Sequence, residues 1–146
     1  MQMDRSKSRK WSNDLLHRAI EFHGHGGPYI VIGLRMGLLA LERLNCRGWF
    51  DIRCRAALTL EPPCSCVIDG IQCSTGCTMG KRNIEVEAGD EIEAEFTNGS
   101  KKMKVALRQE VFRSIQDGLA ESSDEYVRQL TNQIVSADDA ELFEIA

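Results

Sequence analysis

The sequence has few aromatic residues and no long apolar run. Phe, Trp and Tyr make up 6% of its 146 residues, and its most apolar stretch, residues 28–41, is interrupted by Gly33, Arg35 and Gly37. A membrane-spanning helix needs about 20 consecutive apolar residues. The polar start MQMDRSKSRKW also lacks the apolar segment of a secretory signal. We therefore expect a cytoplasmic protein that has no membrane partner.

Basic charge is densest in the first ten residues, and acidic residues dominate from Asp117 onward. The net charge is −4, and the early basic cluster consists of Arg5, Lys7, Arg9 and Lys10. Neither interleaved aromatic residues nor a continuing basic face follows this cluster, which predicts no nucleic-acid partner. We interpret residues 1–11 as a flexible basic N-terminus. No repeat or linker divides residues 12–146, so we expect them to form one domain.

The six cysteines have neither the setting of disulfides nor the spacing of a zinc finger. Without an export signal they indicate a reducing compartment, where thiols fill cores, bind metals or react. Cys46 and Cys54 stand alone among apolar residues, and we expect them in the core. The other four fall within fourteen residues: Cys64, Cys66, Cys73 and Cys77. They do not form the paired C-x-x-C spacing of a structural zinc finger.

The turn GCTMGK, residues 76–81, does not have the pattern of a nucleotide-binding loop. It has one residue too few between its glycines, and Arg82 stands where Ser or Thr should follow. The residues before it have a helical pattern, whereas a phosphate loop follows a strand. The cysteine and lysine of this turn are therefore available for other roles.

Helical patterns at both ends of the chain flank alternating patterns in the middle. Ser12 can cap the first helix, Gly24 ends it, and Pro28 suits the first turn of the next. Asn98 and Gly99 form a strong hairpin signal. The expected helices are 13–23, 28–44, 65–76, 109–119, 123–136 and a short one opened by Ser136, and the expected strands are 51–60, 83–89, 90–99 and 101–109. This order favours an α+β fold.

The segment EFHGHGGPYIVIG, residues 21–33, places two histidines one glycine apart. Residues two apart do not share a helix face, so His23 and His25 converge only if the chain leaves helical geometry at Gly24. Gly26 and Gly27 keep the loop bare enough for a ligand to approach. Neutral imidazole binds zinc and similar metals, and it also acts as an acid or base near pH 7. An isolated H-x-H pair is equally compatible with an ordinary loop.

The segment CSCVIDGIQCSTGCTMGKRN, residues 64–83, is the second candidate site. Asp69 lies one helical turn after Cys66 on the same face, where it can orient a histidine or act as an acid or base. Cys77 lies in a glycine-bounded turn, where Lys81 can stabilise its thiolate. Two interpretations remain open. The cysteines can share a metal with the histidines, or Cys77 can serve as a metal-free reactive thiolate.

Three segments taken together resemble a known family. They are FHGHGGPYIVIGLRMGLLALERL, CSCVIDGIQCSTGCTMGKRNI and the final DDAELFEI. In this order they are similar to the core domain of the family named for the E subunit of formylmethanofuran dehydrogenase, over about residues 14–145. Many members have a cysteine where this chain has Gly27. Larger members append a zinc-finger module, and the resemblance implies the core domain without it.

The resemblance implies an α+β core in which helices pack on an antiparallel sheet, within an intertwined homodimer. It also implies a cleft lined by the histidine loop and the cysteine turn. The expected ligands of zinc or another transition metal are His23, His25, Cys66 and Cys77. The expected catalytic groups are Asp69, Lys81 and Cys77.

The family name implies a role in one-carbon metabolism, in the methanogenesis-type reduction of carbon dioxide known from archaea. Other formylmethanofuran dehydrogenase subunits are then the expected partners, and they would carry the molybdenum or tungsten pterin chemistry. If the chain is an enzyme, it is an oxidoreductase-associated subunit. The alternative is a non-catalytic accessory subunit or a metal carrier.

Overall fold

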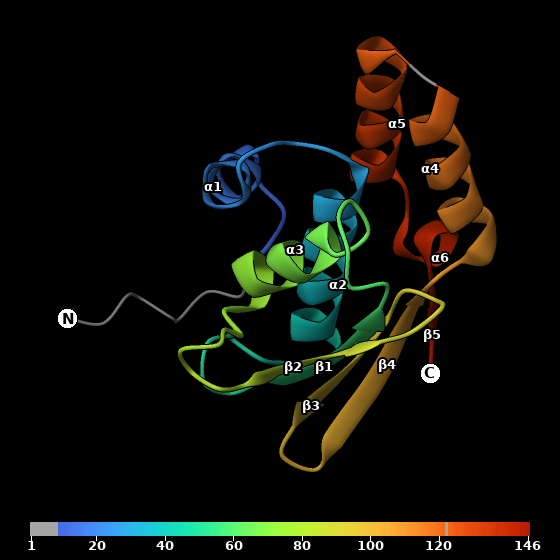
Figure 1. Ribbon diagram of the computed structural model, residues 1–146. Helices are drawn as coiled ribbons and strands as arrows, with labels where there is room; N and C mark the ends of the chain where they lie inside the picture. The colour runs from blue at the N-terminus through green and yellow to red at the C-terminus, as the bar shows by residue number, and fades with distance from the viewer. Residues whose placement is uncertain (1–8, 122) are drawn as a thin grey trace.

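The protein is an α+β structure in which helices cover one face of a five-stranded sheet (Figure 1). The computed structural model describes residues 9–121 and 123–146. The helices are α1 (Asn13–His23), α2 (Pro28–Arg43), α3 (Cys66–Thr75), α4 (Gln109–Glu121), α5 (Asp124–Ser136) and α6 (Asp139–Leu142). The strands are β1 (Arg53–Leu58), β2 (Ile84–Ala88), β3 (Glu93–Asn98), β4 (Lys101–Leu107) and β5 (Phe143–Ile145). The predicted fold class is confirmed.

The sheet is mostly antiparallel and has the order β2-β1-β3-β4-β5. Strands β1 and β3, β3 and β4, and β4 and β5 pair antiparallel, whereas β1 and β2 pair parallel. The parallel pair arises because α3 lies between β1 and β2 in the chain, and parallel neighbours need such a crossover. The sequence pattern identifies both strands but not their relative direction.

Helices α2 and α3 pack so closely that their backbones touch. A Cβ atom on Gly33 would clash with the carbonyl oxygen of Val67, and one on Gly70 would clash with the carbonyl oxygen of Ile30. Both positions therefore require glycine. Because only a short loop separates α1 from α2, this tight helix pair fixes the start of α3 close to the loop that carries the histidines.

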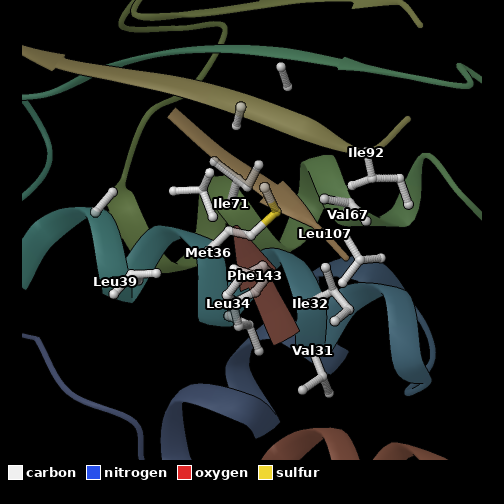
Figure 2. Close-up of a cluster of buried hydrophobic side chains, with 14 of the residues drawn as sticks. Val31, Ile32, Leu34, Met36, Leu39, Val67, Ile71, Ile92, Leu107 and Phe143 are labelled. Carbon is white, nitrogen blue, oxygen red and sulfur yellow. The ribbon is translucent and has the colours of Figure 1, made fainter. Parts of the chain in front are cut away.

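The hydrophobic core lies between this helix pair and the sheet (Figure 2). Ile32, Leu34 and Met36 of α2 are fully buried, together with Ile71 of α3 and Phe143 of β5. Burying such a side chain contributes about 1.5–3 kcal/mol. The core thus joins β5, at the end of the chain, to α2 and α3 and holds these two helices in a fixed position.

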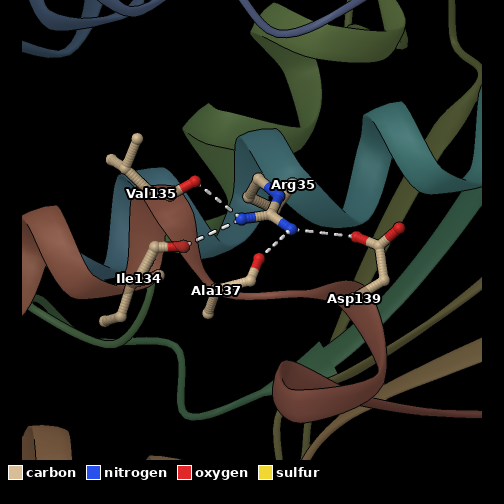
Figure 3. A network of polar contacts seen from close by, with 5 residues as sticks. All are labelled: Arg35, Ile134, Val135, Ala137 and Asp139. Carbon is tan, nitrogen blue, oxygen red and sulfur yellow. Dashed lines mark hydrogen bonds and ion pairs between the residues drawn. The ribbon is translucent and has the colours of Figure 1, made fainter.

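Arg35 ties the C-terminal helices to α2 (Figure 3). Its guanidinium donates hydrogen bonds to the carbonyl oxygens of Ile134 (2.8 Å), Val135 (2.9 Å) and Ala137 (2.7 Å), and it pairs with Asp139 at 3.1 Å. These carbonyls lie at the C-terminal end of α5, where a helix carries partial negative charge. In the sequence Arg35 only interrupts an apolar run, but in the structure it anchors α5 and α6.

The C-terminal segment differs from its prediction in two respects. Ser136 does not open the last helix: its hydroxyl donates to the carbonyl of Asn132 at 3.1 Å within α5, and Asp138 precedes α6. The prediction also omits β5, which has three residues and pairs with β4 at the sheet edge. A strand this short has no measurable alternation, so only its pairing identifies it.

The expected flexible N-terminus falls mostly outside the described residues. Within the described part, Arg9 stacks on the Trp49 ring at 3.8 Å and donates to the carbonyl of Ser74 at 2.8 Å. None of the helices in residues 9–121 and 123–146 has both the length and the apolar character that a bilayer crossing requires.

Candidate metal centre

Three potential metal ligands meet where α1, the following loop and α3 come together. They are His23 at the end of α1, His25 in the loop and Cys66 at the start of α3. One ligand atom from each lies within 4.8 Å of the other two, and the histidine ring centroids are 4.6 Å apart. Gly24 makes this possible, because its φ of 106° ends α1 in a left-handed conformation that favours glycine.

Asp69 fixes the orientation of His23. Its Oδ2 lies 2.5 Å from Nδ1 of His23, and its Oδ1 accepts a hydrogen bond from Gln72 at 3.5 Å. When the Nδ1–H group of a neutral imidazole donates a hydrogen bond to the carboxylate, Nε2 carries a lone pair. This Nε2 is buried and has no hydrogen-bond partner among the described residues. A buried polar atom of this kind calls for an explanation, and a bound ion is one.

The Cys66 thiol is 7% exposed and lies in an environment that disfavours its ionised form. Burial raises its pKa most, followed by the Asp69 carboxylate and the Cys64 thiol. A thiolate at this position therefore needs a nearby cation, which a coordinated metal supplies. Burial, followed by the Cys64 and Cys66 thiols, raises the pKa of the neighbouring Tyr29 to about 12.

The three ligands line a small pocket of about 120 Å³. Its other walls are Gly26, Gly27, Pro28, Tyr29, Ile30, Pro63, Leu119 and Val127. A Cβ atom on Gly27 would meet nothing within 4 Å, so the space beside the histidines is open at this position. The surroundings of the ligands are thus mainly apolar, which strengthens electrostatic interactions inside the pocket.

Within the chain, Cys77 and Lys81 lie away from this group. Helix α3 has ten residues and is about 15 Å long, and the Cys77 turn lies beyond its far end. Cys77 is fully buried, with its sulfur 3.5 Å from the carbonyl oxygen of Ile52. Lys81 Nζ donates to the hydroxyl of Thr78 at 2.9 Å. The histidines and these two side chains therefore do not share a pocket in one chain, because a rigid helix separates them.

The turn around Cys77 is held by hydrogen bonds that the sequence did not reveal. Asn83, 5% exposed, donates to the carbonyls of Trp49 (2.6 Å) and Ile52 (3.2 Å) and accepts from the amide of Thr78 at 2.9 Å. These contacts join the turn to the loop before β1. These hydrogen bonds thus give the turn around Cys77 a structural role.

Sequence reasoning also missed part of the pocket wall. Tyr29 is the second residue of α2 and comes only four residues after His25, so its place in the pocket wall could have been predicted. Leu119 and Val127 come from α4 and α5, about a hundred residues later in the chain. No local pattern relates those helices to the loop.

The fold and the site define an α+β protein with a candidate centre of two histidines and one cysteine. The family model described as "FmdE, Molybdenum formylmethanofuran dehydrogenase operon" matches residues 22–144. The chain belongs to this family, as the resemblance in the sequence predicts.

Two further proteins are similar to the chain. The crystal structure of a tungsten formylmethanofuran dehydrogenase FmdE-like protein from Syntrophus aciditrophicus superposes with a TM-score of 0.65 and 17% identity, covering 96% of this chain and 75% of that one. This likeness shows the fold. A protein from Archaeoglobus fulgidus, named a probable S-adenosyl-L-methionine-binding protein, is 37% identical over 71 residues. That match covers 48% of this chain, but the chain spans only 19% of the relative.

Proposed function

We propose that the chain binds one transition-metal ion, zinc, through His23, His25 and Cys66. The observation that carries the proposal is Nε2 of His23, which is buried without a partner among the described residues while Nδ1 is engaged by Asp69. In metal-binding histidines the second ring nitrogen usually donates a hydrogen bond, through its N–H group, to a carboxylate, a backbone carbonyl or water. The alternative, a buried lone pair facing nothing, would cost about 1–3 kcal/mol.

The chemistry of the donors suits zinc. Imidazole nitrogen and thiolate sulfur are its usual ligands, and three protein ligands are typical of catalytic zinc sites, whereas structural sites have four. In the described part of the chain, no fourth His, Cys, Asp or Glu joins the group. Zinc held in this way would act as a Lewis acid that polarises a carbonyl or a similar group.

The surrounding residues have separate tasks in this proposal. Asp69 holds the His23 ring so that Nε2 faces the pocket. Cys66 gives up its proton when the metal binds, so metal affinity rises with pH. Gly27 leaves room for a small molecule beside the ligands, because its side chain is a single hydrogen.

We further propose that this site serves a formylmethanofuran dehydrogenase-type system of one-carbon metabolism. The support is the family description and the fold shared with the FmdE-like protein of Syntrophus aciditrophicus. A metal carrier is the second candidate, because His25 is exposed and one ligand could release the ion to a partner. Exchange of the bound metal with a chelator separates the two: a carrier loses it within minutes, and a resident centre retains it.

Elemental analysis of the purified protein tests the proposal. We expect about one zinc ion per chain in the wild type and a large loss in His25→Ala, while His17→Ala, which changes an exposed histidine on α1, keeps its metal. Negligible metal in the wild type after reconstitution with zinc, or equal content in both variants, would contradict the ligand set.

A further inference from the structure

A second cavity adjoins the histidine pocket. It has a volume of about 410 Å³ and lies between α1 and α5. The two cavities share Gly26, Gly27 and Val127 in their walls. In Figure 1 the loop that carries the histidines runs across the space between α1 and α5. The larger cavity, which we call the α1–α5 groove, therefore lies next to the candidate metal centre and shares a wall with its pocket.

The walls of the α1–α5 groove are mainly apolar. Leu16 and Ile20 of α1, Val31 of α2 and Val127 of α5 line it. The charged residues in its wall, Asp124 and Arg128, are both exposed and belong to the first half of α5. A cavity of several hundred Å³ with apolar walls and few polar groups is typical of small-molecule sites.

Gly27 marks the boundary between the two cavities. A Cβ atom here would meet nothing within 4 Å, and its φ of 178° is an extended conformation that any residue adopts. No backbone or packing requirement for glycine is therefore visible at this position. The missing side chain leaves free space where the histidine pocket and the groove share a wall, and we call this space the passage.

We propose that the metal centre takes an elongated small molecule with an apolar body and an oxygen donor at one end. The donor group enters the histidine pocket, and the apolar body lies in the α1–α5 groove. The apolar walls select the body, and the small pocket, about 120 Å³, admits only the end group beside the metal. This inference rests on the proposed metal site, since the donor group needs the metal as its partner.

The free energy of burying an apolar chain allows the inference to be tested through binding affinities. Each methylene group that moves from water into an apolar site contributes enough free energy to tighten binding about four-fold. A series of straight-chain hydroxamates, from acetohydroxamate to octanohydroxamate, places a metal-binding group at one end and lengthens the apolar body stepwise. For the zinc-loaded protein we expect the dissociation constant to fall about three- to four-fold per methylene until the groove is filled.

Two variants test whether the dependence of affinity on chain length arises at Gly27. Gly27→Leu fills the passage, and we expect the dependence on chain length to flatten while the zinc content stays at one per chain. Gly80→Leu is the matched control, because that glycine also has room for a side chain but lies in the Cys77 turn beyond the other end of α3. If Gly27→Leu is unstable, Val127→Trp narrows the same passage from α5 and replaces it.

The outcomes separate this inference from the proposed function. A wild-type protein that takes up no zinc overturns both. A zinc-loaded protein that binds all hydroxamates with equal affinity keeps its metal site but has no groove for the apolar body. A chain-length dependence that survives in Gly27→Leu and Val127→Trp also overturns the inference, because the body then lies elsewhere.

Discussion

At the start of α3, Cys66 lies beside two histidines and the pocket that they line, whereas just beyond the end of the same helix Cys77 lies against the carbonyl oxygen of Ile52. Both thiols are buried, and burial is the main cause of the raised pKa of each. The two ends of α3 differ in whether the polar atoms beside the thiol have hydrogen-bond partners. At the first end Nε2 of His23 has no partner among the described residues, while at the second the polar groups around Cys77 are bonded to one another.

The difference shows that a cysteine close to glycines and a lysine is not by itself a reactive centre. Nearby positive charge does lower the pKa of Cys77, but burial outweighs it, and the net shift is upward. Its sulfur has no access to solvent. Cys66 is chemically similar but lies next to His23, whose buried Nε2 has no hydrogen-bond partner among the described residues. The side chains around each cysteine, more than the thiol group itself, determine what Cys66 and Cys77 do at the two ends of α3.

The largest expected effect comes from removing a histidine ligand. His23→Ala should weaken zinc binding by more than about 100-fold, because loss of an outer-shell partner alone costs roughly 10–100-fold. His17→Ala should leave the affinity unchanged. Competition titrations against a chelator of known affinity measure both. Equal affinities would show that α1 does not supply a ligand.

Removal of the orienting carboxylate should have the next largest effect. Asp69→Asn keeps the shape of the side chain but removes the charge that holds His23, and we expect zinc affinity to fall about 10- to 100-fold. Asp51→Asn is the matched control at the other end of α3, where the carboxylate accepts hydrogen bonds from the amides of Arg47 and Gly48. It should lower the stability and leave zinc affinity unchanged. If Asp51→Asn lowered the zinc affinity and Asp69→Asn did not, the metal would bind at the Cys77 end of α3 and the assignment would be wrong.

Cys77→Ala should affect stability and leave metal binding intact. Truncation of a fully buried side chain leaves a small cavity, and we expect the free energy of unfolding to fall by about 1–2 kcal/mol. Urea unfolding of the metal-free protein, followed by circular dichroism, gives this value. A variant as stable as the wild type would show that the turn is not held in the way the structure describes.

Stability should decrease above pH 9. Burial raises the pKa of Cys46 to about 11, and it also raises the pKa of Cys54 and Cys77 above the ordinary value of 9.0. The unfolded chain therefore loses thiol protons first and binds fewer protons than the folded chain. The contribution is complete below about pH 9 and is lost as the pH rises through 9 toward 11. Urea unfolding under reducing conditions from pH 7 to 10 tests this; a constant midpoint would mean that the thiols are accessible.

Lys81→Ala should have the smallest effect. Its ammonium group donates to the Thr78 hydroxyl and lies 5.8 Å from the centroid of the Phe50 ring, over its face. We expect a change in stability within about 0.5 kcal/mol and no change in zinc affinity. A tenfold loss of affinity would instead indicate that Lys81 reaches the centre, for example from a second copy of the chain.

Most of the elements could be predicted from local patterns, because Ser12, Gly24 and Pro28 mark helix boundaries through their own backbone and side-chain chemistry. The position of β5 and the direction of β2 depend on pairing between distant segments, which local patterns do not contain. The same reason explains why Leu119 of the pocket was missed.

The candidate site was predictable only in part. Asp69 and Cys66 share a helix face, so their proximity follows from spacing. Whether that face meets the histidines depends on the close packing of α2 on α3, which glycines at positions 33 and 70 permit. The resemblance also implied that Cys77 belongs to the site, although the expected helix 65–76 already separates this residue from Cys66, as α3 does in the structure.

The most direct test of the account compares the two thiols. Zinc affinity is measured by chelator competition for the wild type, Cys66→Ala and Cys77→Ala, each checked for folding by circular dichroism. We predict a loss of more than about 100-fold for Cys66→Ala and a value within about three-fold of the wild type for Cys77→Ala. Equal losses in both variants, or none in Cys66→Ala, would contradict the assignment of the metal centre to the start of α3.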